Sequence, residues 1–101
     1  MRRALIVYTT QYKEGGNLFE AVAHTLSDKK KAEGMHVWCE PTETKAALKG
    51  VFDRITSSGE SIDELHFVGH SGMYGPMFGT VKYPEQFSPH EIRVMNIPFS
   101  A

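Results

Sequence analysis

The sequence predicts a small α/β domain built on a parallel sheet. Three short apolar segments, each typical of a buried strand, alternate with two segments whose apolar residues recur at three- and four-residue spacing. The chain has 101 residues, 41% of them hydrophobic, which suits one globular core. Two right-handed crossovers then give a Rossmann-like, three-layer parallel sheet, most simply with strand order 2-1-3. We expect residues 1–101 to form a single α/β domain.

The first strand and helix carry the clearest signals. Residues 4–8, Ala-Leu-Ile-Val-Tyr, are a continuous apolar run, as expected of a central strand buried on both faces. After a loop, Asn17 is expected to cap the first helix, and Gly34 to end it in a left-handed conformation. The predicted core face of this helix consists of Leu18, Phe19, Val22, Ala23 and Leu26.

A second strand and helix follow. Residues 35–39 have the composition of a strand, which Pro41 is expected to end. Either Thr42 or Thr44 can cap the second helix. The apolar spacing predicts a core face made of Ala47, Leu48, Val51, Phe52 and Ile55.

The third strand is predicted over residues 62–68 and leads into a long glycine-rich loop over residues 69–80. Ser88 should then cap a short helix. In the order 2-1-3 the third strand lies at an edge, yet Leu65, Phe67 and Val68 are apolar and we expect the last two to be buried. Proteins normally protect an apolar edge strand by covering it with another element. We expect either a fourth strand in a longer protein, of which this chain is an N-terminal fragment, or a homodimer through this strand.

The candidate site lies where the third strand ends. In a parallel sheet all carboxyl ends share one edge, where α/β proteins commonly build sites. His70 and Ser71 can carry proton or nucleophile chemistry, and we predict them as catalytic residues. The alternative is a purely structural role, in which the glycines only let the chain turn and pack. The predicted ligand-binding residues are Gly69, Gly72, Tyr74, Gly75, Thr9 and Thr10.

Neither candidate nucleophile fits a simple catalytic pair. Cys39 ends the second strand, about 9.6 Å from the third if the first lies between them, whereas a nucleophile and its base need about 3 Å. We expect Cys39 not to contact His70. Gly69 and Ser71 match the first half of the Gly-x-Ser-x-Gly nucleophile elbow, but Met73 replaces the second glycine, which disfavours a serine esterase.

The remaining features exclude several classes of function. Eleven basic and twelve acidic residues give a net charge of −1, which argues against nucleic-acid binding. The five histidines lack the spacing of metal ligands, and no Gly-x-Gly-x-x-Gly follows the first strand, so we predict no metal and no cofactor. Gly15-Gly16 before the helix is only a weak anion-site signal. A single cysteine and the lack of a long apolar segment predict a cytoplasmic protein without membrane contact.

The whole chain, and above all residues 65–80 and 86–91, resembles the N-terminal region of poorly characterised bacterial proteins, some with a methyltransferase-type domain further on. The element order also looks like the first half of a caspase-like (clan CD) peptidase domain. That family places its catalytic His after the third strand and its catalytic Cys after the fourth. The resemblance implies that His70 is a base, although the family's His-Gly is here His70-Ser71-Gly72 and the strand with the Cys is not among these residues.

Two functions follow as predictions. The first is one part of a Cys–His hydrolase-like site, with the Cys outside this chain. The alternative is a non-catalytic ligand-binding or regulatory module attached to an enzyme domain of the methyltransferase type. In both, the glycine-rich segment is expected to bind a small molecule or a peptide.

Overall fold

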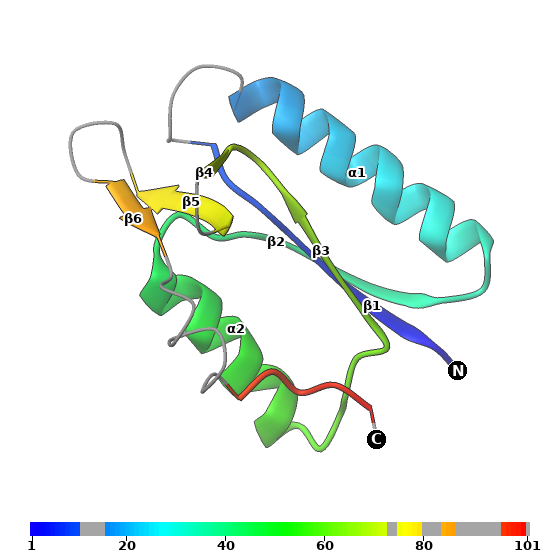
Figure 1. Ribbon diagram of the computed structural model, residues 1–101. Helices are drawn as coiled ribbons and strands as arrows, with labels where there is room; N and C mark the ends of the chain where they lie inside the picture. Colours follow the sequence, from blue (N-terminus) through cyan, green and yellow to red (C-terminus); the bar gives the residue numbers. More distant parts are fainter. Residues whose placement is uncertain (11–15, 73–74, 80–83, 87–95, 101) are drawn as a thin grey trace.

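A computed structural model describes residues 1–10, 16–72, 75–79, 84–86 and 96–100 of the chain (Figure 1). The predicted α/β fold is confirmed, because β1 pairs in parallel with both β2 and β3 to give the order β2-β1-β3. A second, antiparallel sheet has the order β4-β5-β6. The elements are β1 (Arg3–Tyr8), α1 (Gly16–Ala32), β2 (His36–Pro41), α2 (Lys45–Ser57), β3 (Glu64–Val68), β4 (Ser71–Gly72), β5 (Gly75–Gly79) and β6 (Pro84–Gln86).

β1 is the centre of the domain, as its uniformly apolar sequence predicts. Residues 4–8 are all buried, because β1 has a strand on each side and a helix over each face. Side chains alternate between faces along a strand. Leu5 and Val7 therefore join the core under α2, while Ile6 and Tyr8 join the core under α1.

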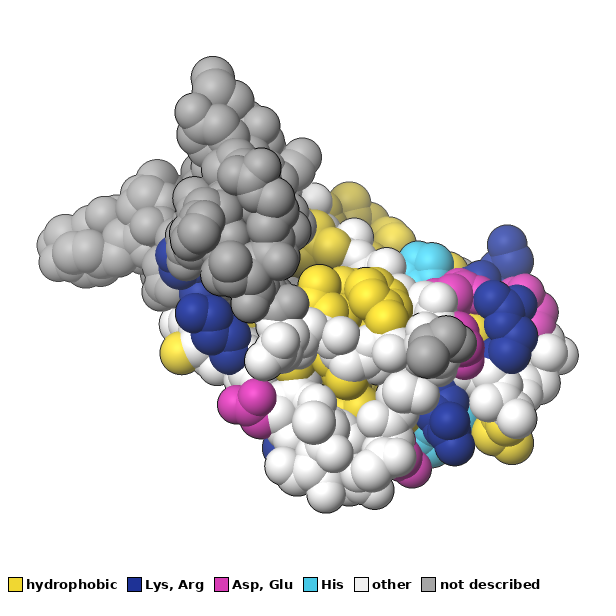
Figure 2. All heavy atoms as spheres, turned by 60° about the horizontal axis from the view of Figure 1, so that its bottom comes forward, with side chains coloured by type: hydrophobic (Ala, Val, Ile, Leu, Met, Phe, Trp, Pro, Cys, Tyr) yellow, Lys and Arg dark blue, Asp and Glu magenta, His cyan; other side chains and the backbone are white. Residues whose placement is uncertain are grey.

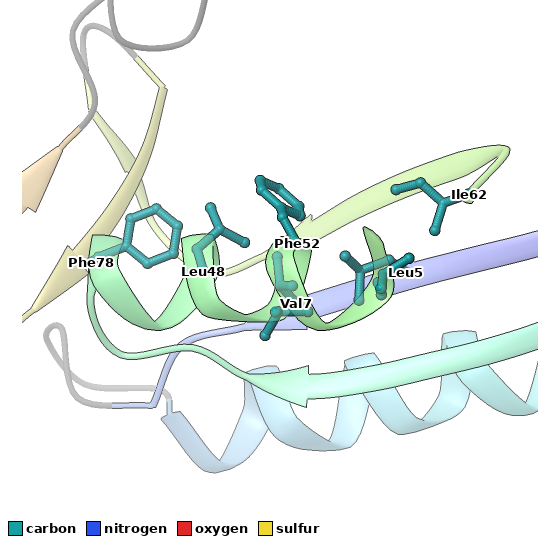
Figure 3. Close-up of a cluster of buried hydrophobic side chains, with 8 residues drawn as sticks. Leu5, Val7, Leu48, Phe52, Ile62 and Phe78 are labelled. Atoms are coloured by element: carbon teal, nitrogen blue, oxygen red, sulfur yellow. The ribbon is translucent and has the colours of Figure 1, made fainter. Parts of the chain in front are cut away.

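The larger core lies between the sheet and α2 (Figure 3). Thr44 caps α2, its hydroxyl oxygen accepting a hydrogen bond from the Ala47 N–H at 3.0 Å. Phe78 of β5 reaches into this core and is fully buried, which ties the small antiparallel sheet to the main one. The buried residues of α2 are Leu48, Val51, Phe52 and Ile55.

The predicted core face of α1 is partly wrong. Ala23 is buried and Phe19 and Leu26 are half-buried, but Leu18 and Val22 are 64% and 45% exposed. A sheet of three strands is too narrow to cover the whole apolar side of the helix. α1 also begins at Gly16, so Asn17 lies inside its first turn and is not the cap. Gly34, with φ +87°, confirms the left-handed ending.

The strand ends also differ from the prediction. β2 runs to Pro41, which an edge strand tolerates, so Pro41 is the last residue of the strand. β3 begins at Glu64, and Phe67 and Val68 are half-buried because they lie in an edge strand.

The long loop predicted after β3 is wrong as well. In the antiparallel pair β4–β5, Ser71 pairs with Pro76 and Gly72 with Gly75, and β5 pairs in turn with β6. Glycine and proline weaken the sequence signal of a strand, which explains why β4 and β5 were not predicted. The helix predicted from Ser88 lies outside the described residues.

The C-terminal segment returns to the main sheet. Phe99 forms a parallel bridge with Ile62, just before β3. The Ile62 N–H donates to the Pro98 carbonyl oxygen at 2.8 Å, and the Ser100 N–H donates to the Ile62 carbonyl oxygen at 2.7 Å. The described chain thus ends beside the start of β3 (Figure 1).

The surface mixes apolar and charged areas. Figure 2 shows hydrophobic side chains in the middle of one face, with charged side chains toward its ends. Among the described residues, neither helix has the length and apolar character that a membrane span needs.

Candidate functional site

The candidate site is the edge of the sheet at which the three parallel strands end, here called the rim. β1 leads into Thr9 and Thr10, β2 into Thr42 and Glu43, and β3 into Gly69 and His70. In an open α/β sheet of order 2-1-3, ligands bind at the point where the strand order reverses, which is between β1 and β3. Four of the predicted site residues, Thr9, Thr10, Gly69 and His70, lie at this rim.

Thr9 and Gly69 lie against each other at the end of β1 and β3. The Thr9 N–H donates to the Val68 carbonyl oxygen at 3.2 Å. A Cβ on Gly69 would lie 2.6 Å from Thr9 Oγ1 and 2.8 Å from Phe67 Cζ, closer than real Cβ contacts allow. Gly69 therefore serves the close approach of the two strand ends, which is a structural role.

Thr10 is bound to Glu43, a residue that the sequence prediction missed. The Thr10 N–H donates to both carboxylate oxygens of Glu43, at 2.9 and 3.1 Å, and the Thr10 hydroxyl donates to Oε1 at 2.6 Å. These charge-assisted bonds join the loop after β1 to the loop after β2. Because β2 runs to Pro41, Glu43 reaches the rim. The sequence signal that could have identified Glu43 is its acidic side chain directly before Thr44, the cap of α2.

Two threonine hydroxyls are buried at the rim without a hydrogen-bond partner among the described residues. Thr9 and Thr42 follow paired strands, and the Thr42 N–H donates to the Tyr8 carbonyl oxygen at 2.8 Å. Both side chains are buried, yet neither Oγ1 atom has a partner in the described part of the chain. A buried hydroxyl without a partner destabilises a fold, so each of the two calls for an explanation, of which a polar site is one.

His70 lies at the rim against the first turns of α1. Its ring meets that of Phe19 edge to face, with centroids 4.9 Å apart and an interplanar angle of 87°. The imidazole is half-buried. Phe19 was predicted as a core residue, and only the tertiary structure brings it to His70.

Cys39 is remote from His70. The register pairs Cys39 with Ile6, and Ile6 with His66. His70 lies four residues beyond His66, and β1 between β2 and β3 keeps the two outer strands about 9.6 Å apart. Burial also raises the pKa of the Cys39 thiol, with the Lys31 charge opposing. This position agrees with the predicted lack of contact and leaves Cys39 a poor nucleophile.

Three of the other predicted residues, Ser71, Gly72 and Gly75, lie in the antiparallel pair β4–β5 after the rim. Ser71 and Gly72 form β4 and Gly75 begins β5, with Ser71 paired to Pro76 and Gly72 to Gly75. Tyr74 lies outside the described residues. Within the described ranges, no three His, Cys, Asp or Glu side chains are grouped to hold a metal ion.

Two hollows of the described surface lie away from the rim. One, of about 180 Å³, lies between β2 and α2 and includes Trp38 and the ion pair of Arg54 with Glu40, 3.5 Å apart. The other, of about 330 Å³, lies on the outside of α1 around Val22 and Leu26.

Comparisons with models of known protein families, with curated proteins and with solved structures found no match for this chain. The functional argument therefore depends on the geometry of the rim.

Proposed function

We propose that this chain is a ligand-binding module whose site lies at the rim between β1 and β3. The observation that carries the proposal is the position of His70, which follows the contact of Gly69 with Thr9 and lies against Phe19. Open α/β sheets bind ligands at this point of the sheet. The buried hydroxyls of Thr9 and Thr42, which have no partner among the described residues, lie at the same edge.

The chemistry of these residues suits a small polar molecule or a peptide. The imidazole of His70 can donate or accept a hydrogen bond, and Phe19 offers an apolar ring edge beside it. Glu43 holds Thr10 in place at the end of β1, so this residue is positioned before a ligand arrives.

The test is NMR titration of the labelled 101-residue chain with a library of dipeptides and small polar fragments. Binding should shift the amide signals of Thr10, Gly69 and His70, and His70→Ala should abolish those shifts. The matched control is His36→Ala, because His36 also meets an aromatic ring edge to face, that of Trp38, but at the opposite end of the sheet. Shifts that His70→Ala leaves unchanged would contradict the proposal.

A second candidate function is the predicted one, in which His70 is the base of a Cys–His hydrolase-like site. Its place just after β3 favours this role, and the nucleophilic Cys would come from outside this chain. We expect no turnover of peptide or ester substrates by this chain alone. Turnover that His70→Ala removes would show a complete site, and Ser71→Ala and Cys39→Ala would then identify its nucleophile. A methyltransferase-type neighbouring domain, a cytoplasmic location and a homodimer through β3 stay predictions.

A further inference from the structure

We propose that the outer edge of β3 (Glu64–Val68), together with one flank of α1, binds an extended peptide segment of a partner protein. The peptide runs parallel to β3 and continues the line of residues 98–100. In the described part of the chain, β3 pairs with β1 on one side, and no strand pairs with it on the other. This surface is separate from the rim, and the inference does not depend on the proposed function.

The direction of the bound segment follows from the bridge between Phe99 and Ile62. Both backbone groups of Ile62 face outward and bond to Pro98 and Ser100, in a parallel pair. Residues 98–100 therefore already lie beside the residue that precedes β3, in the place of a neighbouring strand, and they run parallel to β3. A strand placed beside Glu64–Val68 extends the sheet in the same sense.

The orientation of α1 leaves an apolar flank above this edge. Two contacts hold α1 over β3: the Phe19 ring against His70 at one end, and Lys30 Nζ at 3.0 Å from Glu64 Oε1 at the other. On the side of β1, the His24 ring lies against Tyr8. At about 100° per residue, the side of the helix opposite His24 lies beyond β3. This α1 flank consists of Leu18, Val22, Leu26 and Lys29, and the last three line the hollow of about 330 Å³.

The α1 flank defines the chemistry of the peptide. A strand on the outer edge of β3 would turn every second side chain toward α1, where Val22 and Leu26 require apolar partners. Lys29 lies one residue from Lys30, near the start of β3, so it favours an acidic residue at the amino end of a parallel peptide. The expected ligand is an acid followed by alternating apolar residues.

A second copy of the chain fits this edge less well. In a two-fold antiparallel pairing of β3 centred on His66, Ile62 of one copy would lie opposite His70 of the other. Residues 98–100 already occupy the place beside Ile62. A homodimer would therefore have to displace the C-terminal segment, whereas a parallel peptide continues it.

The experiment uses a fluorescein-labelled peptide of eight residues, Asp followed by alternating Val and Thr, and the full 101-residue chain. Fluorescence anisotropy should show saturable binding, and hydrogen exchange should show new protection of the Glu64 and His66 amides, which face the outer edge as that of Ile62 does. Val22→Glu and Lys29→Glu should each weaken binding at least about tenfold, the first by placing a charge on the apolar surface and the second by repelling the acid. Lys31→Glu is the matched control, because Lys31 is an exposed lysine of α1 on the opposite flank, and it should leave binding unchanged.

Orientation and competing occupants are tested in the same system. A nitroxide on the amino end of the peptide should broaden signals near Glu64 more than those near Val68, and a peptide with a central Pro should bind more weakly. Broadening at Val68 instead, equal loss of binding in Lys31→Glu, or no saturation would overturn the proposal. So would a dimer in light scattering whose outward-facing Glu64 and His66 amides are protected without peptide, because it would show that a second copy occupies the edge.

Discussion

Gly69 and Thr9 leave no room between them for a further methyl group. A Cβ on Gly69 would lie 2.6 Å from Thr9 Oγ1, because the Thr9 N–H bonds to the Val68 carbonyl oxygen and draws the two strand ends together. The contact of Gly69 with Thr9 therefore determines where the chain leaves β3 and reaches His70.

Gly69→Ala should lower the free energy of unfolding by about 1–3 kcal/mol, since the added methyl group overpacks the contact. Adding Thr9→Ala should recover part of the loss, because the contact with Phe67 at 2.8 Å remains. Urea denaturation measures both. The matched control is Gly50→Ala in α2, where nothing lies within 4 Å of the new Cβ, and it should stabilise by about 1 kcal/mol. Equal tolerance of alanine at both glycines would contradict the packing described.

Thr42→Val should leave the fold as stable or make it more stable by about 1 kcal/mol. The substitution keeps the shape of the side chain and removes a buried hydroxyl that lacks a partner in the described residues. Thr44→Val is the control with the opposite sign, since it removes the hydroxyl that caps α2 and should cost about 1 kcal/mol. A clear loss of thermal stability in Thr42→Val would show that its hydroxyl is hydrogen-bonded.

Thr10→Val should destabilise the chain by about 1–2 kcal/mol, because it removes the hydroxyl bond to Glu43 Oε1 while the Thr10 N–H bonds remain. Thr25→Val, at an exposed position of α1, should change stability by less than about 0.5 kcal/mol. Chemical denaturation of the two variants gives the comparison, and equal effects would mean that the Thr10 hydroxyl does not contribute.

Acid should weaken the fold partly through Glu64. The hydrogen bond from His66 and then that from Lys30 lower the pKa of the Glu64 carboxyl from 4.5 to about 2. A carboxyl whose pKa is lower in the folded state stabilises the fold above its unfolded pKa, and this stabilisation is lost as pH falls from about 4.5 to about 2. Glu64→Gln should flatten the dependence of unfolding free energy on pH in that window. The exposed Asp53→Asn serves as control, and an unchanged curve for Glu64→Gln would refute the assignment.

The main sheet could be predicted because its signals are local. The apolar run over residues 4–8 indicated a central strand, and the alternation of strands and helices indicated the order 2-1-3. Thr44 was one of two predicted caps, and Gly34 was the predicted helix ending. At the rim, parallel topology alone was enough to place Thr9, Thr10, Gly69 and His70 on one edge.

The sequence by itself determined which segments are strands and helices of the main sheet and which edge carries the candidate site. Only the tertiary structure decided which apolar residues of α1 are buried, because helical spacing does not report how wide the sheet beneath is. It also brought Glu43 to Thr10 and Phe19 to His70, contacts between residues far apart in the chain. Such contacts depend on strand register and helix orientation, which arise only when the elements pack together.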